Sequence, residues 1–197
     1  MEAADPPGDC PICLCELRER IVRLSACNGH EFHEECIVEC FDETNVFLKC
    51  PICAYIYGIK TGKQPTGTMK VTFLPVGAIP VSGYEQYGTI KIMYHFPSGI
   101  QGEEHEMPGC PYYGTARTCY LPDNDEGVEI LNLLVIAFKR RLTFTIGTSV
   151  KTGKKNAVIW NGIHHKTSPT GGPTKYGYPD ETYFKRVKEE LALCGVS

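Results

Sequence analysis

The sequence has no apolar run long enough to cross a bilayer and no typical secretion signal at its start. The longest wholly apolar run covers residues 133–138, whereas a membrane-spanning helix needs about 20 apolar residues. Residues 1–9 contain acidic residues and prolines where a signal peptide has a basic and then an apolar stretch. We therefore expect no membrane partner, and a reducing setting in the cytoplasm, the nucleus or both.

The cysteines do not form the pattern of a secreted disulfide scaffold. Six of the eleven cysteines belong to a regular array that also contains histidines, and the remaining five lie outside it. Those five are odd in number and scattered, whereas a disulfide framework uses paired cysteines. We expect them to be core residues or inert surface thiols: Cys15, Cys40, Cys110, Cys119 and Cys194.

Basic charge is scarce in the first part of the chain. The formal net charge is −3, but residues 1–57 carry four Lys/Arg against eleven Asp/Glu, while residues 58–197 carry sixteen against twelve. Duplex nucleic acid requires a basic protein face, so we do not expect it as a partner. The mildly basic second part leaves contacts with single-stranded nucleic acid or poly-ADP-ribose open.

Four pairs of metal ligands occupy the first 53 residues. Two CPIC motifs, at residues 10–13 and 50–53, flank CNGHEFHEEC at residues 27–36, with thirteen residues on either side. Two residues separate the ligands of each pair, so one tight turn can present two donors to one ion. The pattern predicts a RING-type module with two structural zinc ions and these ligands: Cys10, Cys13, Cys27, His30, His33, Cys36, Cys50 and Cys53.

In the cross-brace of such modules the pairs alternate between the ions. Cys10, Cys13, His33 and Cys36 would bind one ion, and the remaining four ligands the other. Closed four-ligand sites are structural, and in a module of about fifty residues the metal supplies much of the folding free energy.

A small apolar patch is expected beside the zinc loops, at the place where RING domains dock a ubiquitin-conjugating enzyme (E2), so the likeness to a RING implies such a docking surface. The alternative is a zinc-stapled scaffold without a partner surface. Many RING domains place a basic residue after the last zinc ligand, but this chain has Ala54 there, which predicts weaker intrinsic activity or a bridging role for another residue. The expected docking residues are Ile12, Leu14, Ile37, Phe41 and Pro51.

The domain organisation is predicted from shifts in composition. We expect a tail (1–9), a zinc module (10–57), a linker or extended wrap rich in turn formers (58–68) and a second domain (69–197). Alternating apolar residues predict strands at 69–73 and 90–94; further strands are expected at 142–146 and 157–160. Helices are predicted at 34–44, at 128–141 with Asp125 as its cap, and from Pro179-Asp180 to about Leu193. The whole chain is therefore predicted to be α+β, with a mixed or antiparallel sheet in the second domain.

Several longer motifs recur in a known order. They are YGIKTGKQP (57–65), GIQG (99–102), YLPDN (120–124), FTIGTS (144–149), WNGIHHKT (160–167) and YGYPD (176–180). Over nearly its whole length the chain resembles the Deltex family of E3 ubiquitin ligases, as their RING plus Deltex C-terminal domain. The Gly-Gly-Pro before Tyr176 is most similar to the deltex-three and deltex-three-like branch. The family's N-terminal targeting region is expected to be missing or cut off.

The resemblance implies a composite ligase. Its RING would recruit E2 and ubiquitin, and its C-terminal domain would bind ADP-ribose or NAD. The implied activities are ubiquitination of ADP-ribosylated proteins and ADP-ribosylation of ubiquitin, with an ADP-ribosyltransferase as a further partner and with roles in Notch signalling and DNA damage. By motif position, Thr148, Ser149, His164, Tyr176 and Tyr178 would contact the nucleotide. Glu190, Tyr176 and His164 are the implied catalytic residues.

Each implied site residue also has a structural interpretation. Ser149 can cap a turn, one histidine of the His164-His165 pair can be structural, Trp160 can belong to the core, and Glu190 can pair with Arg186 one helical turn earlier. A carboxylate near the buried helix face, however, needs a partner or a function.

Some Deltex proteins have a histidine at the position of Tyr176. A neutral phenol is a poor base, so we expect nucleotide binding to be retained while the chemistry is changed or slowed. The alternative function is a non-catalytic reader of ADP-ribosylated partners whose zinc module is only structural.

Overall fold

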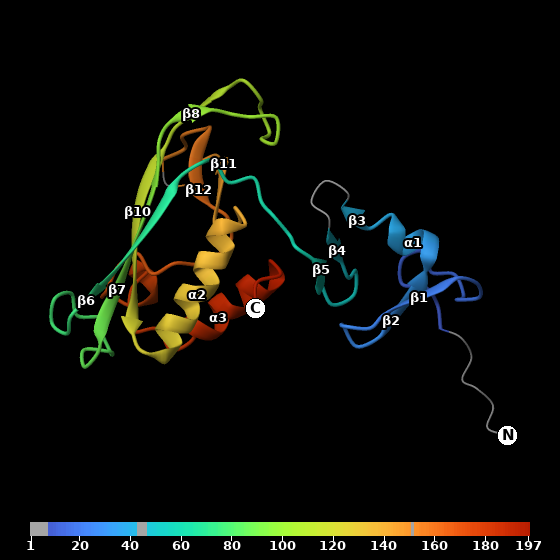
Figure 1. Cartoon of the computed structure of the whole chain (residues 1–197), viewed down its shortest axis with the longest axis horizontal. Helices are drawn as coiled ribbons and strands as arrows, with labels where there is room; N and C mark the ends of the chain where they lie inside the picture. Colours follow the sequence, from blue (N-terminus) through green and yellow to red (C-terminus); the bar gives the residue numbers. More distant parts are fainter. Residues whose placement is uncertain (1–7, 43–46, 151) are drawn as a thin grey trace. The chain divides into compact units, whose positions relative to one another are not determined.

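The structure is a computed structural model of the whole chain and describes residues 8–42, 47–150 and 152–197 (Figure 1). The chain divides into two compact units, residues 1–60 and residues 61–197. Each unit has its own hydrophobic cluster. In the part of the chain that is described, no helix combines the length and the apolar character that a membrane span requires.

The first unit is a small, mostly β-stranded module. Strands β1 and β2 form one antiparallel hairpin, and β3, β4 and β5 form a separate antiparallel sheet in that order. The elements are β1 (Ile21–Leu24), β2 (His30–His33), α1 (Glu34–Val38), β3 (Phe41–Asp42), β4 (Phe47–Lys49) and β5 (Ile56–Gly58).

The helix of this unit is shorter than the sequence predicts. We expected it to continue to residue 44, but α1 ends at Val38, and residues 43–44 lie outside the described part. Phe41 instead pairs with Leu48 across β3 and β4. A helix this short gains little from its own hydrogen bonds, so strand pairing after Val38 competes successfully with helix extension.

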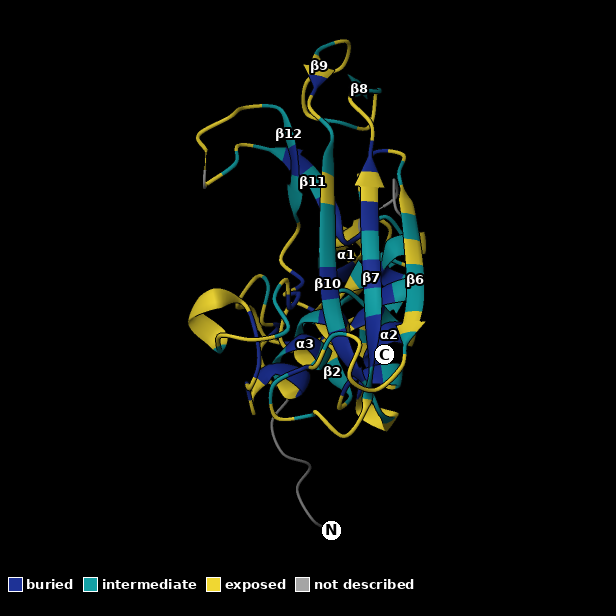
Figure 2. Cartoon of the chain, turned by 90° about the vertical axis from the view of Figure 1, so that its left-hand side faces the viewer, coloured by how far each residue is buried: buried dark blue, intermediate teal, exposed yellow. Residues whose placement is uncertain are grey.

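The second unit is built on a three-stranded antiparallel sheet in the order β10-β7-β6. In Figure 2 its strands lie in front of α2, which packs against β10, and α3 packs against α2. The unit contains β6 (Thr68–Leu74), β7 (Gly88–Phe96), β8 (Gly99–Ile100), β9 (Pro111–Tyr112), β10 (Thr115–Asp123), α2 (Asp125–Lys139), β11 (Phe144–Gly147), β12 (Ala157–Trp160), a 3-10 helix (Pro173–Lys175) and α3 (Tyr183–Leu193).

One continuous core lies between this sheet and the helices. Alternate residues of β7 enter it, because successive side chains of a strand point to opposite faces. Helix α2 contributes Ile130 and Leu134, and α3 contributes Val187 and Leu191, all essentially inaccessible to solvent. The strand residues of this core include Ile90, Ile92, Tyr94, Leu121 and Phe144.

The predicted α+β class and the antiparallel sheet are confirmed, as are both alternating strands and the last helix. The start of α2 differs: Asn124, not Asp125, is the N-cap, and its side-chain oxygen accepts a hydrogen bond from Gly127 N at 2.9 Å. Strand β10 was not predicted. Its alternation is obscured by Arg117 and Thr118 in the middle and by Pro122 near its end.

The segment expected as a linker contributes to the second unit from Thr61 onward. Gly62 N donates to Arg140 O at 2.8 Å, and a Cβ at Gly62 would lie 2.1 Å from Arg141 O. Gln64 is buried, and its side-chain oxygen accepts from Phe144 N at 3.0 Å. Residues 61–67 therefore form an extended wrap that is anchored where α2 ends and β11 begins.

Candidate metal centres and ligand cavity

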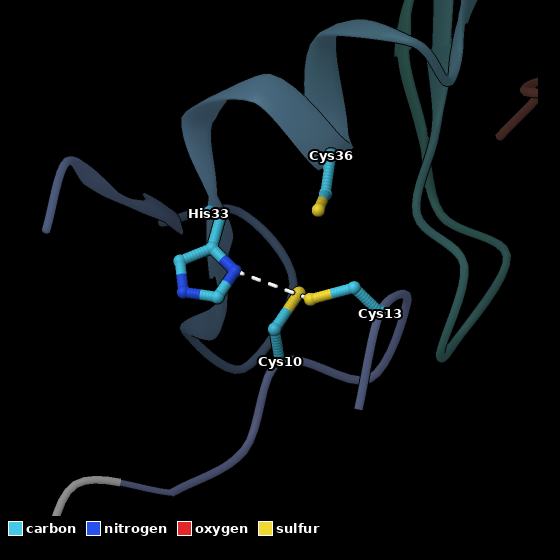
Figure 3. Close-up of side chains that lie close together, drawn as sticks. All are labelled: Cys10, Cys13, His33 and Cys36. Atoms are coloured by element: carbon cyan, nitrogen blue, oxygen red, sulfur yellow. Dashed lines mark hydrogen bonds between the residues drawn. The ribbon is translucent and has the colours of Figure 1, made fainter. Parts of the chain in front are cut away.

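The first group of metal ligands consists of Cys10, Cys13, His33 and Cys36 (Figure 3). A loop before β1 supplies two cysteines, the end of β2 supplies the histidine, and α1 supplies Cys36. Their ligand atoms all lie within 4.8 Å of one another. His33 Nδ1 is 3.3 Å from Cys13 Sγ, and its Nε2 is 3.1 Å from Glu16 O. A carbonyl at the second ring nitrogen orients a metal-binding imidazole.

The second group consists of Cys27, His30, Cys50 and Cys53, again within 4.8 Å. His30 Nδ1 lies 3.5 Å from Cys50 Sγ. The hydroxyl of Tyr57 donates to Cys27 Sγ at 3.1 Å, a contact that we did not predict. Hydrogen bonds to a ligating sulfur are the kind of outer contact that tunes a metal site.

The two CPIC motifs fold into the same turn. Leu14 N donates to Cys10 O at 2.8 Å, and Ala54 N donates to Cys50 O at 2.9 Å. Leu14 and Ala54 have nearly equal positive φ angles of 61° and 62°. Each group offers three sulfurs and one imidazole nitrogen, a donor set that suits a closed tetrahedral zinc site. The predicted cross-brace, with alternating pairs, is therefore confirmed.

Apolar side chains are exposed around these turns. Leu14 is 78% exposed and Ile52 is 48% exposed. Of the other predicted docking residues, Pro51 and Phe41 are exposed, although Phe41 lies on β3 and not on the helix. Ile12 is half-buried against the core.

Ile37 has to be corrected. It is only 4% exposed, because the inner face of α1 carries it into the small core. It therefore belongs to the fold and not to the surface. Ile52 is not among the residues predicted from sequence, although it occupies the same place in the second CPIC motif as Ile12 in the first.

The second unit contains a cavity of about 200 Å³. Two of the predicted catalytic residues, His164 and Tyr176, line it. The third, Glu190, contacts His164 twice: its carboxylate accepts from the backbone N of His164 at 2.8 Å and lies 2.5 Å from Nδ1 of the ring. The cavity is lined by His164, His165, Lys166, Pro173, Tyr176, Tyr183 and Arg186.

The predicted alternative partner of Glu190 is wrong. Arg186 donates instead to Asp180 Oδ2, at 3.1 Å, and to Thr182 Oγ1, at 2.9 Å. Glu190 has a side chain only 17% exposed, whereas that of His164 is 60% exposed. The pair thus presents an accessible imidazole that is supported from behind by a carboxylate.

The two tyrosines of the YGYPD motif have different environments. Tyr176 follows the 3-10 helix in a left-handed conformation, φ 54°, and is 64% exposed at the cavity. Tyr178 is fully buried, donates its hydroxyl to Tyr120 O at 3.1 Å and does not line the cavity. Burial raises the pKa of Tyr178 well above its ordinary value. Tyr178 therefore has a core environment.

Thr148 and Ser149 do not line the cavity either. They follow β11 in the connection to β12, where Ser149 N donates to Lys154 O at 2.9 Å and Gly153 N donates to Ser149 O at 2.7 Å. This agrees with the turn interpretation of Ser149.

His165 is the structural member of the histidine pair. Its Nδ1 lies 2.9 Å from Ile163 O, its Nε2 lies 3.1 Å from Tyr94 Oη, and its ring stacks on Trp160 with centroids 4.2 Å apart. Complete burial lowers the pKa of His165 to about 4. Trp160 also stacks on Phe144, so the core interpretation of Trp160 is supported.

A buried ion pair that the sequence does not predict lies beside the cavity. Lys166 Nζ donates to Asp180 Oδ2 at 2.6 Å, and both side chains are almost inaccessible. Burial by itself raises the pKa of Asp180, but hydrogen bonds from Lys166, Arg186 and Thr182 outweigh it and lower that pKa to about 2. Lys166 lies in the WNGIHHKT motif and Asp180 in the YGYPD motif. Their opposite charges are the one sequence feature that could have indicated this pair.

Known proteins match both units. Residues 8–54 match the Ring finger domain, and residues 61–196 match the Deltex C-terminal domain. The chain is 48% identical to the human probable E3 ubiquitin-protein ligase DTX3, over 100% of this chain and 55% of that protein. It is 42% identical to human E3 ubiquitin-protein ligase DTX1, over 98% of this chain and 34% of that protein, and 41% identical to mouse E3 ubiquitin-protein ligase DTX4, over 98% and 33%.

The chain thus spans about half, or less, of the length of these curated relatives. The Deltex C-terminal domain match covers well over half of the chain and begins a few residues after the Ring finger match ends. Both matches agree with the zinc-ligand geometry and with the motifs of the second unit. The chain belongs to the Deltex family.

Proposed function

We propose that this chain acts as a RING-type E3 ubiquitin ligase whose second unit binds ADP-ribose or NAD. The observation that carries the ligase proposal is the pair of closed Cys/His groups, with exposed Leu14 and Ile52 beside them. The names of the relatives, which are E3 ubiquitin-protein ligases, support the same activity.

The first unit would act by positioning and not as a nucleophile. Zinc supplies structural cross-links when bound to the two groups, and thiolates in closed zinc sites are not free to accept ubiquitin. The exposed apolar surface would hold a ubiquitin-charged E2, so that an incoming nucleophile attacks the thioester in a favourable orientation. Leu14 is 78% exposed, against 43% for Phe41, and is therefore the anchor to test.

The second unit would bind one part of the nucleotide in its cavity. A volume of about 200 Å³ is below the roughly 300–1,000 Å³ of pockets for drug-sized ligands. The remainder of ADP-ribose or NAD would therefore lie over the surface, where the hydroxyls of Thr148 and Ser149 are the proposed contacts. The exposed ring of Tyr176 can stack on an aromatic base or pack against a sugar.

The Glu190–His164 pair is the proposed catalytic group. The His164 imidazole, oriented by the Glu190 carboxylate at its Nδ1, would accept the proton of a ribose hydroxyl, and the carboxylate would stabilise the imidazolium that forms. Tyr176 would bind and orient the ligand without acting as a base. The proposed substrates are ADP-ribosylated proteins, because their ribose carries the hydroxyl that the site would recognise. ADP-ribosylation of ubiquitin is the second proposed activity.

The ligase proposal is tested by reconstituted ubiquitination with a ubiquitin-activating enzyme, a panel of E2s, ATP and ubiquitin. We expect ubiquitin chains or autoubiquitination with at least one E2, and at least a tenfold decrease in rate for Leu14→Ala, as is typical of an interface anchor costing more than about 1.4 kcal/mol. Leu193→Ala is the matched control, because Leu193 is also exposed but lies at the end of α3. Absence of activity with every E2 would contradict the proposal.

The nucleotide proposal is tested by calorimetric titration with ADP-ribose. Tyr176→Ala should weaken binding, whereas Tyr87→Ala should not, because Tyr87 is exposed outside the cavity. A wild-type protein that gives neither binding heat nor a thermal shift would refute the site. If ADP-ribose binds while no E2 is stimulated, the chain is the alternative non-catalytic reader.

A further inference from the structure

Lys166 is a buried cation in the wall of the cavity. Its side chain is 4% exposed, and its Nζ donates to Gly177 O at 2.7 Å as well as to Asp180 Oδ2. The ammonium also lies 5.1 Å from the ring centroid of Tyr183 and 5.5 Å from that of Tyr178. A buried ammonium is tolerated only when it is paired and hydrogen-bonded, and here both conditions are met.

The contacts of Lys166 join the three segments that carry the cavity residues. Lys166 lies two residues after His164 in the chain. Its first acceptor, Gly177 O, directly follows Tyr176, and its second acceptor, Asp180, precedes α3, from which Glu190 reaches His164. One ammonium group therefore connects the local chain segments that place His164, Tyr176 and Glu190.

Tyr176 depends on its backbone for its position. Its side chain makes no hydrogen bond to the residues that the structure describes, and it is largely exposed. The loop around it is closed by Gly172 N, which donates to Tyr178 O at 2.9 Å, and by Gly177 N, which donates to Gly172 O at 2.8 Å. A Cβ at Gly177 would lie 1.9 Å from Thr170 O. The loop is thus tightly closed on itself, and Lys166 ties its Gly177 carbonyl to the interior.

Stability alone does not explain a buried ion pair at this place. Replacing such a pair with apolar or neutral groups of similar size is often neutral for stability, while removing one partner is strongly destabilising. Arg186 and Thr182 already donate to the Asp180 carboxylate. Lys166 is a third donor to this carboxylate and, unlike the other two, also donates to Gly177 O.

We propose that Lys166 is a positioning residue: its ammonium holds the Gly177 carbonyl and thereby places Tyr176 at the cavity that His164 also lines. The effect on ligand affinity rests on the proposed binding of an ADP-ribose-type nucleotide in this cavity. The effect on the Tyr176 loop does not, and it can be measured without ligand.

The test uses Lys166→Met alone and together with Asp180→Asn. The single variant removes the ammonium and leaves a buried carboxylate with fewer partners, so it is expected to lower the thermal midpoint. The double variant removes both charges and keeps one acceptor oxygen, which can face either Arg186 or Thr182, so most of the lost midpoint should recover. Lys188→Met is the matched control, because Lys188 forms a partly exposed pair with Glu129 at 2.7 Å on the same unit.

Two measurements are made on each variant. Amide resonances of Tyr176 and Gly177 in ¹H–¹⁵N spectra should shift or broaden in both Lys166 variants and remain in place in the control. The dissociation constant for ADP-ribose should rise about tenfold in the double variant, because a preorganised contact group is lost. Lys166→Arg keeps a donor for both acceptors and should retain most of the affinity.

A purely structural role predicts a different pattern. In that case a double variant with a recovered thermal midpoint binds ADP-ribose like the wild type, and its Tyr176 and Gly177 resonances stay in place. Those two results would overturn the positioning proposal. Tyr176→Ala provides the coupling test: it should weaken binding less in the double variant than in the wild type, and equal effects would also contradict positioning. If the wild type does not bind ADP-ribose, the proposed function fails, while the resonances still decide whether Lys166 positions the loop.

Discussion

Apart from cysteines, the core cluster of the first unit contains Leu17, Leu24, Phe32 and Ile37 among the described residues, whereas the second unit joins residues of β7, β10, β11, α2 and α3 in one continuous core. The first unit places eight potential metal ligands around its few apolar side chains. The second places its polar groups at a cavity beside its core. Metal bound to these groups would replace apolar burial in the first unit, as small domains require, whereas the second unit has a large core of its own.

The largest expected difference between the units is their response to chelation. Removing zinc should cost the first unit about 10 kcal/mol or more per site, which unfolds it, while the second unit keeps its fold. Fluorescence of Trp160, the single tryptophan, reports on the second unit alone. Far-ultraviolet dichroism should fall on chelation while the Trp160 emission stays constant, and a parallel change in both would contradict separate stabilisation.

Shortening a core side chain should affect only the second unit. Leu134 on α2 is fully buried, so Leu134→Ala is expected to lower the free energy of unfolding by about 2–5 kcal/mol. Denaturant titration followed by Trp160 fluorescence measures the loss, and zinc content should remain normal. Leu193→Ala is the control with a change within about 0.5 kcal/mol; a similar loss in both variants would show that the core assignment of Leu134 is wrong.

Mild acid should weaken the second unit through His165. Because the folded protein holds the pKa of His165 at about 4, below the ordinary value of about 6.5, protons bind more readily to the unfolded chain. The stabilisation is complete above pH 6.5 and is lost as the pH falls toward 4, by about 3 kcal/mol in all. Asp180, with its pKa lowered to about 2, extends the loss below pH 3.8.

Denaturant titrations followed by Trp160 fluorescence between pH 7 and pH 4 measure this slope. His165→Gln should flatten it, although it also lowers stability at pH 7 through lost packing. His95→Gln, which changes an exposed histidine on β7, should leave the slope as in the wild type. An unchanged slope in His165→Gln would assign the acid sensitivity to other groups.

The smallest expected effect on stability is that of Leu14→Ala. Leu14 is 78% exposed, so the free energy of unfolding should change by less than about 0.5 kcal/mol. The zinc content should not change. Its effect should appear instead in E2-dependent ubiquitin transfer. A large loss of stability would mean that Leu14 supports the turn and is not a surface anchor.

The parts of the structure that could be predicted from sequence depend on local spacing. The zinc ligands were predictable because two residues between ligands fit one turn, and both CPIC turns indeed have the same hydrogen bonds. Helix α3 and the strands β6 and β7 were predictable because their apolar residues keep a regular period. Strand β10 was not predictable, because polar and apolar residues do not alternate regularly along it.

The cavity depends on contacts that spacing does not encode. Tyr176 and Tyr178 lie two residues apart, but only Tyr176 reaches the cavity, because it follows the 3-10 helix in a left-handed conformation. Arg186 lies one helical turn before Glu190 but forms its ion pair with Asp180. The carboxylate of Glu190 contacts His164 instead. The Glu190–His164 pairing joins residues 26 positions apart in the sequence, and only the folded chain brings them together.

The central claim is that the zinc-held unit serves ubiquitin transfer while the second unit binds the nucleotide on its own. It is tested most directly by measuring ubiquitin discharge from a charged E2 and the dissociation constant for ADP-ribose in the same preparation, before and after zinc removal. The account predicts that zinc removal abolishes discharge and leaves ADP-ribose affinity unchanged. Loss of ADP-ribose binding together with discharge, or discharge that survives without zinc, would contradict it.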